Sequence, residues 1–290
     1  MIARITILCF AASYGVALAL EISRLFFRLS VRRMLTLGMA AAGLLAHSLF
    51  LAHRATSVPE GGTPLSSWYD WYLVAAWIVA AAYLLLALTR PESALGVFLL
   101  PPALLLIGFA APLHDAPPFP QAEAVSAWGK AHGYALLLGT VTVTLGFASG
   151  VMYLVQSYRL KHHLPPQSGF RLPSLEWLQK VNQQSMWLST FLVALGLLAG
   201  IIYNAVKRHG SGGALPWTDS LVITSGMLLL WLVAATTFEY FYKPAQQGRK
   251  VAYITVASFI FLAAALFVSV FGGTKHAIDR GPPPNAEAAP

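Results

Sequence analysis

The sequence has few charged residues and a single cysteine. The first shortage argues against a soluble domain, and the second excludes cysteine-based sites. Only 10% of its 290 residues are charged, whereas 57% are hydrophobic; soluble domains carry about 25% charged residues. The lone Cys9 excludes an intrachain disulfide and a Cys-x-x-Cys site. Gly-rich phosphate loops, His-Glu-x-x-His sites and nucleophile elbows are also missing, so the common hydrolase and nucleotide-binding motifs give no support to those functions.

The hydrophobic residues are gathered in long runs, which indicates an integral membrane protein. Each run is near the ~20 residues that cross about 30 Å of hydrocarbon. The runs cover residues 3–21, 34–53, 70–89, 95–112, 131–156, 186–206, 220–242 and 251–272. Because a lipid-facing backbone must satisfy its own hydrogen bonds, we predict helices. The expected fold class is all-α, a polytopic bundle of about eight transmembrane helices.

The chain is expected to form one transmembrane helical domain over residues 1–276, followed by a disordered tail over residues 277–290 that contains a run of prolines. Residues 3–21 loosely fit a signal peptide, but we favour a retained helix. Within the loop at 157–185, Ser174 is predicted to cap a short helix over residues 175–180 that lies along the membrane surface.

Basic residues predict the orientation of the bundle. The loop after the first apolar run, residues 22–33, holds four arginines, whereas Arg4 is the only basic residue at the start of that run. Loops at 157–185 and 243–250 are also richer in cations than the loops on the other side. The positive-inside rule therefore predicts that both termini lie outside, N-out and C-out. The net charge of +8 then reflects orientation in the bilayer and not binding to nucleic acid.

Six of the eight histidines fall at or near the predicted outer face, and His132 is the most informative of them. On a helix, Gly139, Gly146 and Gly150 share its face. Glycine stripes mark close helix packing, so His132 should point into the bundle. The alternative is an interfacial histidine that bonds a neighbouring loop. His47, on a small-residue face, lies deeper, where an imidazole is costly and usually functional.

The outer face also holds the other groups that a heme requires. Neutral imidazole binds iron, and two imidazoles can hold a heme from opposite faces. Aromatic contacts could come from Trp128, Trp217, Trp68 and Trp71, and Lys130 is among the cations available for the propionates. An interfacial tryptophan belt is the alternative for most of these side chains. The lack of a mid-membrane carboxylate disfavours a third class, a small-solute transporter.

Three motifs between residues 128 and 276 carry a resemblance to a known family. The segment from Trp128 to His132 resembles a family helix that begins with an outer-face histidine. The turn at residues 216–219 is similar to a reduced form of a tryptophan-rich heme motif, and the last helix ends in a histidine, His276. The family is cytochrome c assembly, the heme-handling membrane proteins that include CcsA, CcmC and the smaller HemX-like members.

The resemblance implies a set of ligands for heme b. In the family, the two outer-face histidines that flank the tryptophan motif bind the heme iron, which here implies His132 and His276. His47 corresponds in character to histidines that receive heme inside the membrane. The candidate cofactor-binding residues are therefore His132, His276, Trp217, Asp219, His47 and Trp128.

The resemblance also implies a function. We expect heme presentation at the outer face of a bacterial inner (cytoplasmic) membrane, in support of cytochrome c biogenesis. The expected partners are heme, apocytochrome c and another cytochrome c assembly membrane protein. The role would be that of an assembly factor and not an enzyme, because the bond-forming chemistry belongs to the heme and the thiols. The alternative is a HemX-like scaffold that regulates heme synthesis or a respiratory complex without binding heme.

Overall fold

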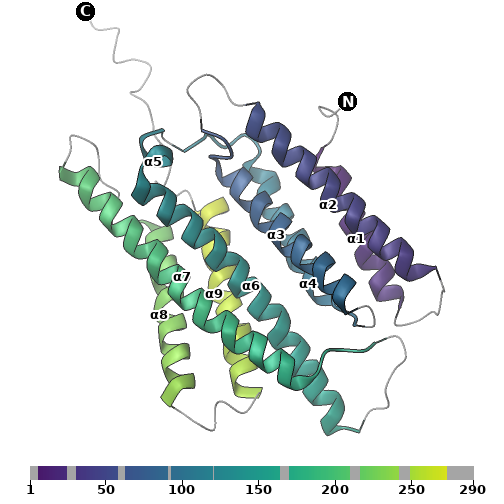
Figure 1. The fold of residues 1–290 in the computed structure, drawn as a ribbon. Coiled ribbons are helices and arrows are strands. Elements are labelled where there is room, and N and C mark those ends of the chain that lie inside the picture. Colours follow the sequence, from purple (N-terminus) through teal and green to yellow (C-terminus); the bar gives the residue numbers. More distant parts are fainter. Residues whose placement is uncertain are drawn as a thin grey trace, which may run out of the picture.

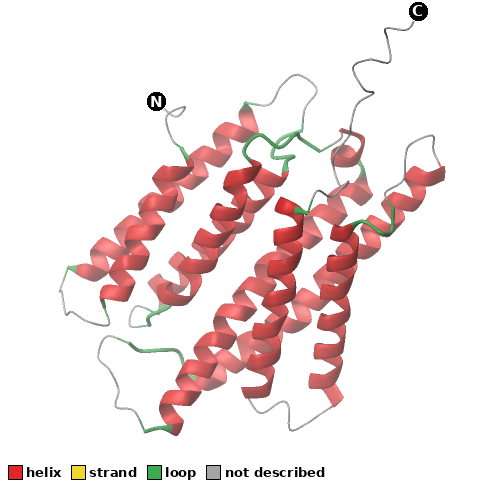
Figure 2. Cartoon of the chain, turned by 180° about the vertical axis from the view of Figure 1, so that it is seen from behind, coloured by secondary structure: helices red, strands yellow, loops and turns green. Residues whose placement is uncertain are grey.

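The computed structural model describes residues 6–24, 31–57, 63–90, 93–119, 121–163, 170–209, 216–241 and 249–272. Within these residues the chain is helical and forms no strand (Figure 2). The helices are α1 (Ile7–Ser23), α2 (Arg32–Thr56), α3 (Trp68–Thr89), α4 (Gly96–Ala110), α5 (Gln121–Val125), α6 (Ala127–Lys161), α7 (Leu175–His209), α8 (Ser220–Phe241) and α9 (Arg249–Phe271). A 3-10 turn, η2 (Ala111–Leu113), extends α4. The predicted all-α class is confirmed, and the predicted tail lies outside the described residues.

Each predicted apolar run corresponds to its own helix, in α1 to α4 and in α6 to α9. Seven of the described helices are long and apolar enough to cross a membrane, and α1 is a shorter apolar helix. Such helices satisfy their backbone hydrogen bonds internally, which is what the interior of a bilayer demands. The protein is therefore a multi-pass membrane protein.

The predicted surface helix over residues 175–180 is wrong in its extent. Ser174 accepts a hydrogen bond from the Trp177 N–H at 3.3 Å, which confirms the predicted cap. The helix that begins there, α7, continues without a break to His209. Glu176 and Lys180 are exposed, but Asn182 and Ser185 further along are only 2% and 8% exposed, so the polar stretch after residue 180 continues the helix into the bundle.

The helices form two groups that meet mainly through α6. Helices α1 to α4 pack together, and so do α6 to α9 (Figures 1 and 2). Helix α6 contacts α3 and α4 in the first group and α7 and α9 in the second. Helices α6 and α7 have 35 residues each, which is about 52 Å at 1.5 Å per residue. Both are longer than the ~30 Å hydrocarbon core, so they tilt or extend into the headgroup region.

Helix α1 begins and α9 ends at the same end of the bundle, which we call the N-terminal end (Figure 1). A chain that crosses a membrane an even number of times has its first and last helices opening and closing on the same side. The ring of Phe50 near the end of α2 lies 6.4 Å from that of Tyr69 at the start of α3, which places both at the N-terminal end. The N-out and C-out orientation of this end stays a prediction.

The predicted glycine face of α6 packs against neighbouring helices. A Cβ added at Gly139 would lie 2.9 Å from a methyl carbon of Val193 on α7. A Cβ at Gly150 would lie 3.2 Å from the Ala252 carbonyl oxygen on α9. Since neither position has room for a side chain, glycine lets the helix backbones approach closely. The prediction that this face of α6 points into the bundle is confirmed.

We expect Gly139→Val to destabilise the protein because its methyl groups would overlap Val193. Overpacking of this kind costs about 1–3 kcal/mol. The control is Gly108→Val in α4, where an added Cβ meets nothing within 4 Å. Thermal unfolding of the purified protein in detergent, followed by tryptophan fluorescence, would measure both. Equal unfolding temperatures for the two variants would contradict the close packing of α6 on α7.

Candidate functional site

A cavity of about 360 Å³ lies at the N-terminal end of the bundle, where α3 meets α6. Its wall comes from the loop at residues 63–66, from α3, from Phe119 and from the first turns of α6, with Leu266 of α9 at one side. The aromatic, basic and imidazole side chains of this wall are Trp68, Trp71, Phe119, Lys130, His132 and Tyr134. A cavity of this size, with mostly apolar walls and few polar groups, is typical of ligand sites.

His132 is the imidazole of this cavity, and α7 fixes its orientation. The His132 Nδ1 atom lies 2.7 Å from the carbonyl oxygen of Gly196. Because a carbonyl can only accept, Nδ1 donates to it, and in the neutral ring Nε2 then carries the lone pair. One turn further along α7, a Cβ at Gly200 would lie 2.6 Å from His132 Nδ1, so only glycine leaves room for the ring.

Aromatic rings form much of the cavity wall. The Trp71 ring lies 5.6 Å from Tyr134 at an interplanar angle of 31° and 6.2 Å from Phe119. The Trp68 ring meets Phe119 edge-on at 5.6 Å. Gly133 on α6 faces the benzene ring of Trp71, where a Cβ would lie 3.0 Å from Cζ2. These contacts bring α3, α6 and the segment before α5 together around one space.

The loop at residues 63–67 closes the outer side of the cavity. Phe119 donates its N–H to the Ser66 carbonyl at 2.6 Å, and the Ser66 hydroxyl donates to the Thr63 carbonyl at 2.8 Å. Leu65, which also lines the cavity, has a φ of +50°. That conformation is unusual for a bulky residue and is often found at ligand sites.

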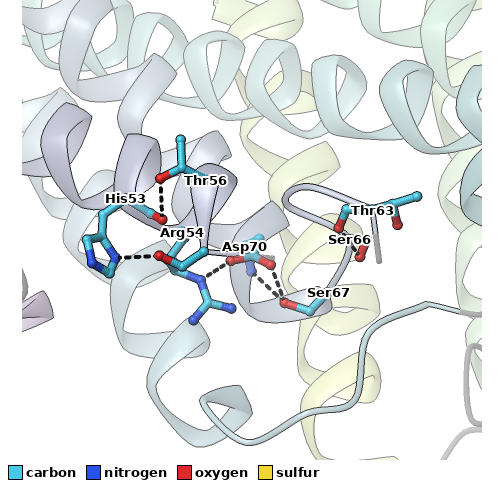
Figure 3. A network of polar contacts seen from close by, with 8 residues as sticks. His53, Arg54, Thr56, Thr63, Ser66, Ser67 and Asp70 are labelled. Atoms are coloured by element: carbon cyan, nitrogen blue, oxygen red, sulfur yellow. Dashed lines mark hydrogen bonds and ion pairs between the residues drawn. The ribbon is translucent and has the colours of Figure 1, made fainter. Parts of the chain in front are cut away.

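A charged contact anchors this loop to α2. Arg54 donates to the carboxylate of Asp70 at the start of α3, and the Ser67 hydroxyl donates to the other carboxylate oxygen at 2.6 Å (Figure 3). The Asp70 N–H in turn donates to the Ser67 hydroxyl at 3.2 Å. Asp70 is 4% exposed, so a nearly buried carboxylate joins α2, α3 and the loop.

The other predicted outer-face residues lie elsewhere. Trp217 and Trp128 are 50% and 46% exposed, and neither lines the cavity. Asp219 accepts a hydrogen bond from the Leu221 N–H at 2.9 Å, which makes it a cap for the start of α8. Trp217 and Asp219 are not among the residues that line the cavity with His132, and their contact with heme stays a prediction. His276 lies outside the described residues.

His47 is buried, as its small-residue face predicted, but it does not line the cavity. Its ring stacks on Phe10 of α1 at 4.0 Å, and its Nδ1 lies 3.4 Å from the Tyr14 hydroxyl. Nε2 is buried and has no hydrogen-bond partner among the described residues. His47 thus belongs to the packing of α1 on α2, and its role with heme stays a prediction.

Residues 65–275 match the sequence model of a family described as Cytochrome C assembly protein. The chain belongs to the cytochrome c assembly family. The match covers α3 to α9 and with them His132, Trp71 and Lys130; it leaves out His47 and ends one residue before His276. Membership supports a role in cytochrome c biogenesis. No curated protein and no solved structure matches the chain.

Sequence reasoning missed two parts of this site. The first is the place of Trp71 in the cavity wall, because the sequence offered it only as one of four outer-face tryptophans, which an interfacial belt would also explain. The second is the contact of Arg54 with Asp70, which joins two helices through residues 16 positions apart. The one available signal was a carboxylate at the start of an apolar run, with an arginine at the end of the run before it.

We expect Asp70→Asn to lower the unfolding temperature, because the substitution removes the charge that Arg54 binds. The Arg54 side chain is 34% exposed, so solvent reduces the cost to about 1–2 kcal/mol. The control is Asp115→Asn, whose carboxylate is 97% exposed beside His114; its effect should stay within about 0.5 kcal/mol. Thermal unfolding in detergent measures both variants, and a larger effect at Asp115 would contradict the anchoring role.

Proposed function

We propose that this cytochrome c assembly protein binds heme b in the cavity between α3 and α6, with His132 as an axial ligand. The observation that carries the proposal is the hydrogen bond of 2.7 Å from His132 Nδ1 to the Gly196 carbonyl at the wall of this cavity. A histidine that binds a metal through one nitrogen commonly donates from its other nitrogen to a carbonyl or carboxylate. That bond orients the ring and raises its basicity.

The aromatic wall of the cavity and the cation at its mouth support a porphyrin acid as the ligand. The rings of Trp71 and Tyr134 lie at 31° to one another, so they offer flat apolar surface to a flat ligand. Lys130 lines the same cavity and is exposed, which places a cation where the space opens to solvent. The apolar walls would exclude water from the iron-binding side of His132, since heme stability depends on an apolar slot.

His276 is the proposed second ligand. It follows α9, the helix whose Leu266 lines the cavity. The Tyr72 hydroxyl of α3 donates to the Leu266 carbonyl at 2.9 Å and therefore holds the end of α9 close to the cavity. When bound, heme supplies the redox and bond-forming chemistry; this chain binds, orients and shields it.

The proposed role is that of an assembly factor and not an enzyme. Cys9 is exposed on α1 and has no second cysteine with which to form a disulfide, so a partner membrane protein would handle the thiols of apocytochrome c. We place the protein in a bacterial inner membrane with the cavity at the outer face, in agreement with the positive-inside pattern.

We expect the purified wild-type protein to show a Soret band, with or without added hemin, and His132→Ala to lose most of it. The reason is that alanine leaves the iron without the imidazole from α6. His53→Ala is the control, because His53 is exposed at the end of α2 and bonds Ser57. The visible spectrum and a hemin titration measure the difference.

Several results would contradict heme binding by His132. One is a wild-type protein that shows no Soret band even after hemin is added. Another is an unchanged spectrum in the double variant His132→Ala, His276→Ala. Normal cytochrome c maturation after both histidines are replaced would instead support a scaffold that does not bind heme.

A second variant moves the imidazole without removing it. We expect Gly200→Ala to displace the His132 ring, because the added Cβ would lie 2.6 Å from Nδ1. The Soret band should shift or weaken as ligation is lost, and hemin affinity should fall about tenfold, equivalent to ~1.4 kcal/mol. Gly226→Ala on α8 is the control, since a Cβ there meets nothing within 4 Å. An unchanged spectrum for Gly200→Ala would show that the orientation of this ring does not matter.

A further inference from the structure

The indole N–H of Trp71 is buried and has no hydrogen-bond partner among the described residues. Two other tryptophans within the helices do have partners. Trp77 Nε1 donates to the Ser48 hydroxyl at 2.8 Å, and Trp231 Nε1 donates to the Ser258 hydroxyl at 3.0 Å. Buried donors are nearly always paired in folded proteins, because an unmade hydrogen bond is costly. Trp71 is therefore a donor that lacks an acceptor.

Trp71 lines the cavity next to a cation. Its benzene ring lies against Gly133 on α6, and residues three apart on a helix are neighbours on one face. Lys130 is three residues before Gly133, so it lies on the face of α6 that meets this ring. Lys130 also lines the cavity and is exposed at its mouth. The described residues place no carboxylate within ion-pair distance of Lys130.

We propose that Trp71 and Lys130 together bind a carboxylate of the ligand that occupies this cavity. The indole Nε1 is buried in the structure, so the ring must turn toward the cavity for its N–H to give one directional hydrogen bond. The ammonium gives charge at the solvent side. Trp71 would thereby select a ligand with a carboxylate at its edge, and would set which edge of a flat ligand faces outward. The inference rests on the proposed function, since it names how the cavity recognises a porphyrin acid.

A lipid phosphate could accept from the same two donors. The arrangement of the walls favours the porphyrin, because a flat ligand with acids on one edge can contact the Trp71 and Tyr134 rings and reach Lys130 at once. Competition with phosphatidylglycerol distinguishes a lipid phosphate from a porphyrin carboxylate.

The test uses protoporphyrin IX, which has the two carboxylates but no iron, and its dimethyl ester. Both are titrated into the full-length protein in detergent, with porphyrin fluorescence as the measure of binding. We expect Trp71→Phe, which keeps the ring and removes the N–H, to weaken binding of the acid about tenfold. The ester should be affected less than about threefold, because an ester oxygen is uncharged and accepts more weakly. Lys130→Gln should show the same selectivity.

Trp231→Phe is the matched control. It removes an indole N–H that already has a partner, on a helix that does not line the cavity. Both affinities should remain at their wild-type values in this variant. An unfolded variant would be recognised by its gel-filtration profile, and Lys130→Gln at the exposed mouth then serves as the second test of the same site.

Three outcomes would overturn the inference. The first is wild-type affinity of Trp71→Phe for the acid, and the second is an equal loss for acid and ester. The third is displacement of the porphyrin acid by phosphatidylglycerol from the wild type but not from Trp71→Phe, which would assign the donors to a lipid. Because protoporphyrin IX lacks iron, its binding can be measured and interpreted even if His132 does not ligate heme iron. Conversely, heme ligation can stand while Trp71 proves irrelevant.

Discussion

The close approach of α6 to α7 is the constraint on which the candidate site depends. In a bilayer no water is available to satisfy an imidazole N–H, so a buried histidine needs a protein acceptor. His132 finds one in the Gly196 carbonyl only because α7 presents glycine at positions 196 and 200. Larger residues would push the helices apart and leave the ring without its partner. The glycines that allow close packing of α6 on α7 therefore also orient the candidate heme ligand.

The cavity exists where the two groups of helices meet. Helix α3 supplies Trp71 from the first group, and α6 supplies His132 and Lys130 from the second. The carboxylate of Asp70 ties α3 to α2 through Arg54, and Tyr72 ties α3 to α9. The walls are thus held from both sides by polar contacts at the N-terminal end.

Much of the fold could be predicted from the sequence because a bilayer leaves few choices. A run of about 20 apolar residues must be a helix, and a glycine stripe beside a histidine must face another helix. The prediction for residues 175–180 was wrong because polar residues such as Asn182 and Ser185 resemble a surface pattern. Their burial against α6 depends on the partner helix, which periodicity along one chain does not reveal.

By itself, the sequence determined the class of protein, the positions of its spans, the inward face of α6 and the family to which it belongs. These follow from hydrophobicity, period and motif, all of which are local properties of the chain. Only the tertiary structure decided which tryptophans line the cavity with His132, namely Trp68 and Trp71 of α3 and not Trp217 before α8. The physical reason is that a cavity is defined by distances between helices, and residues far apart in the chain become neighbours only after those helices pack.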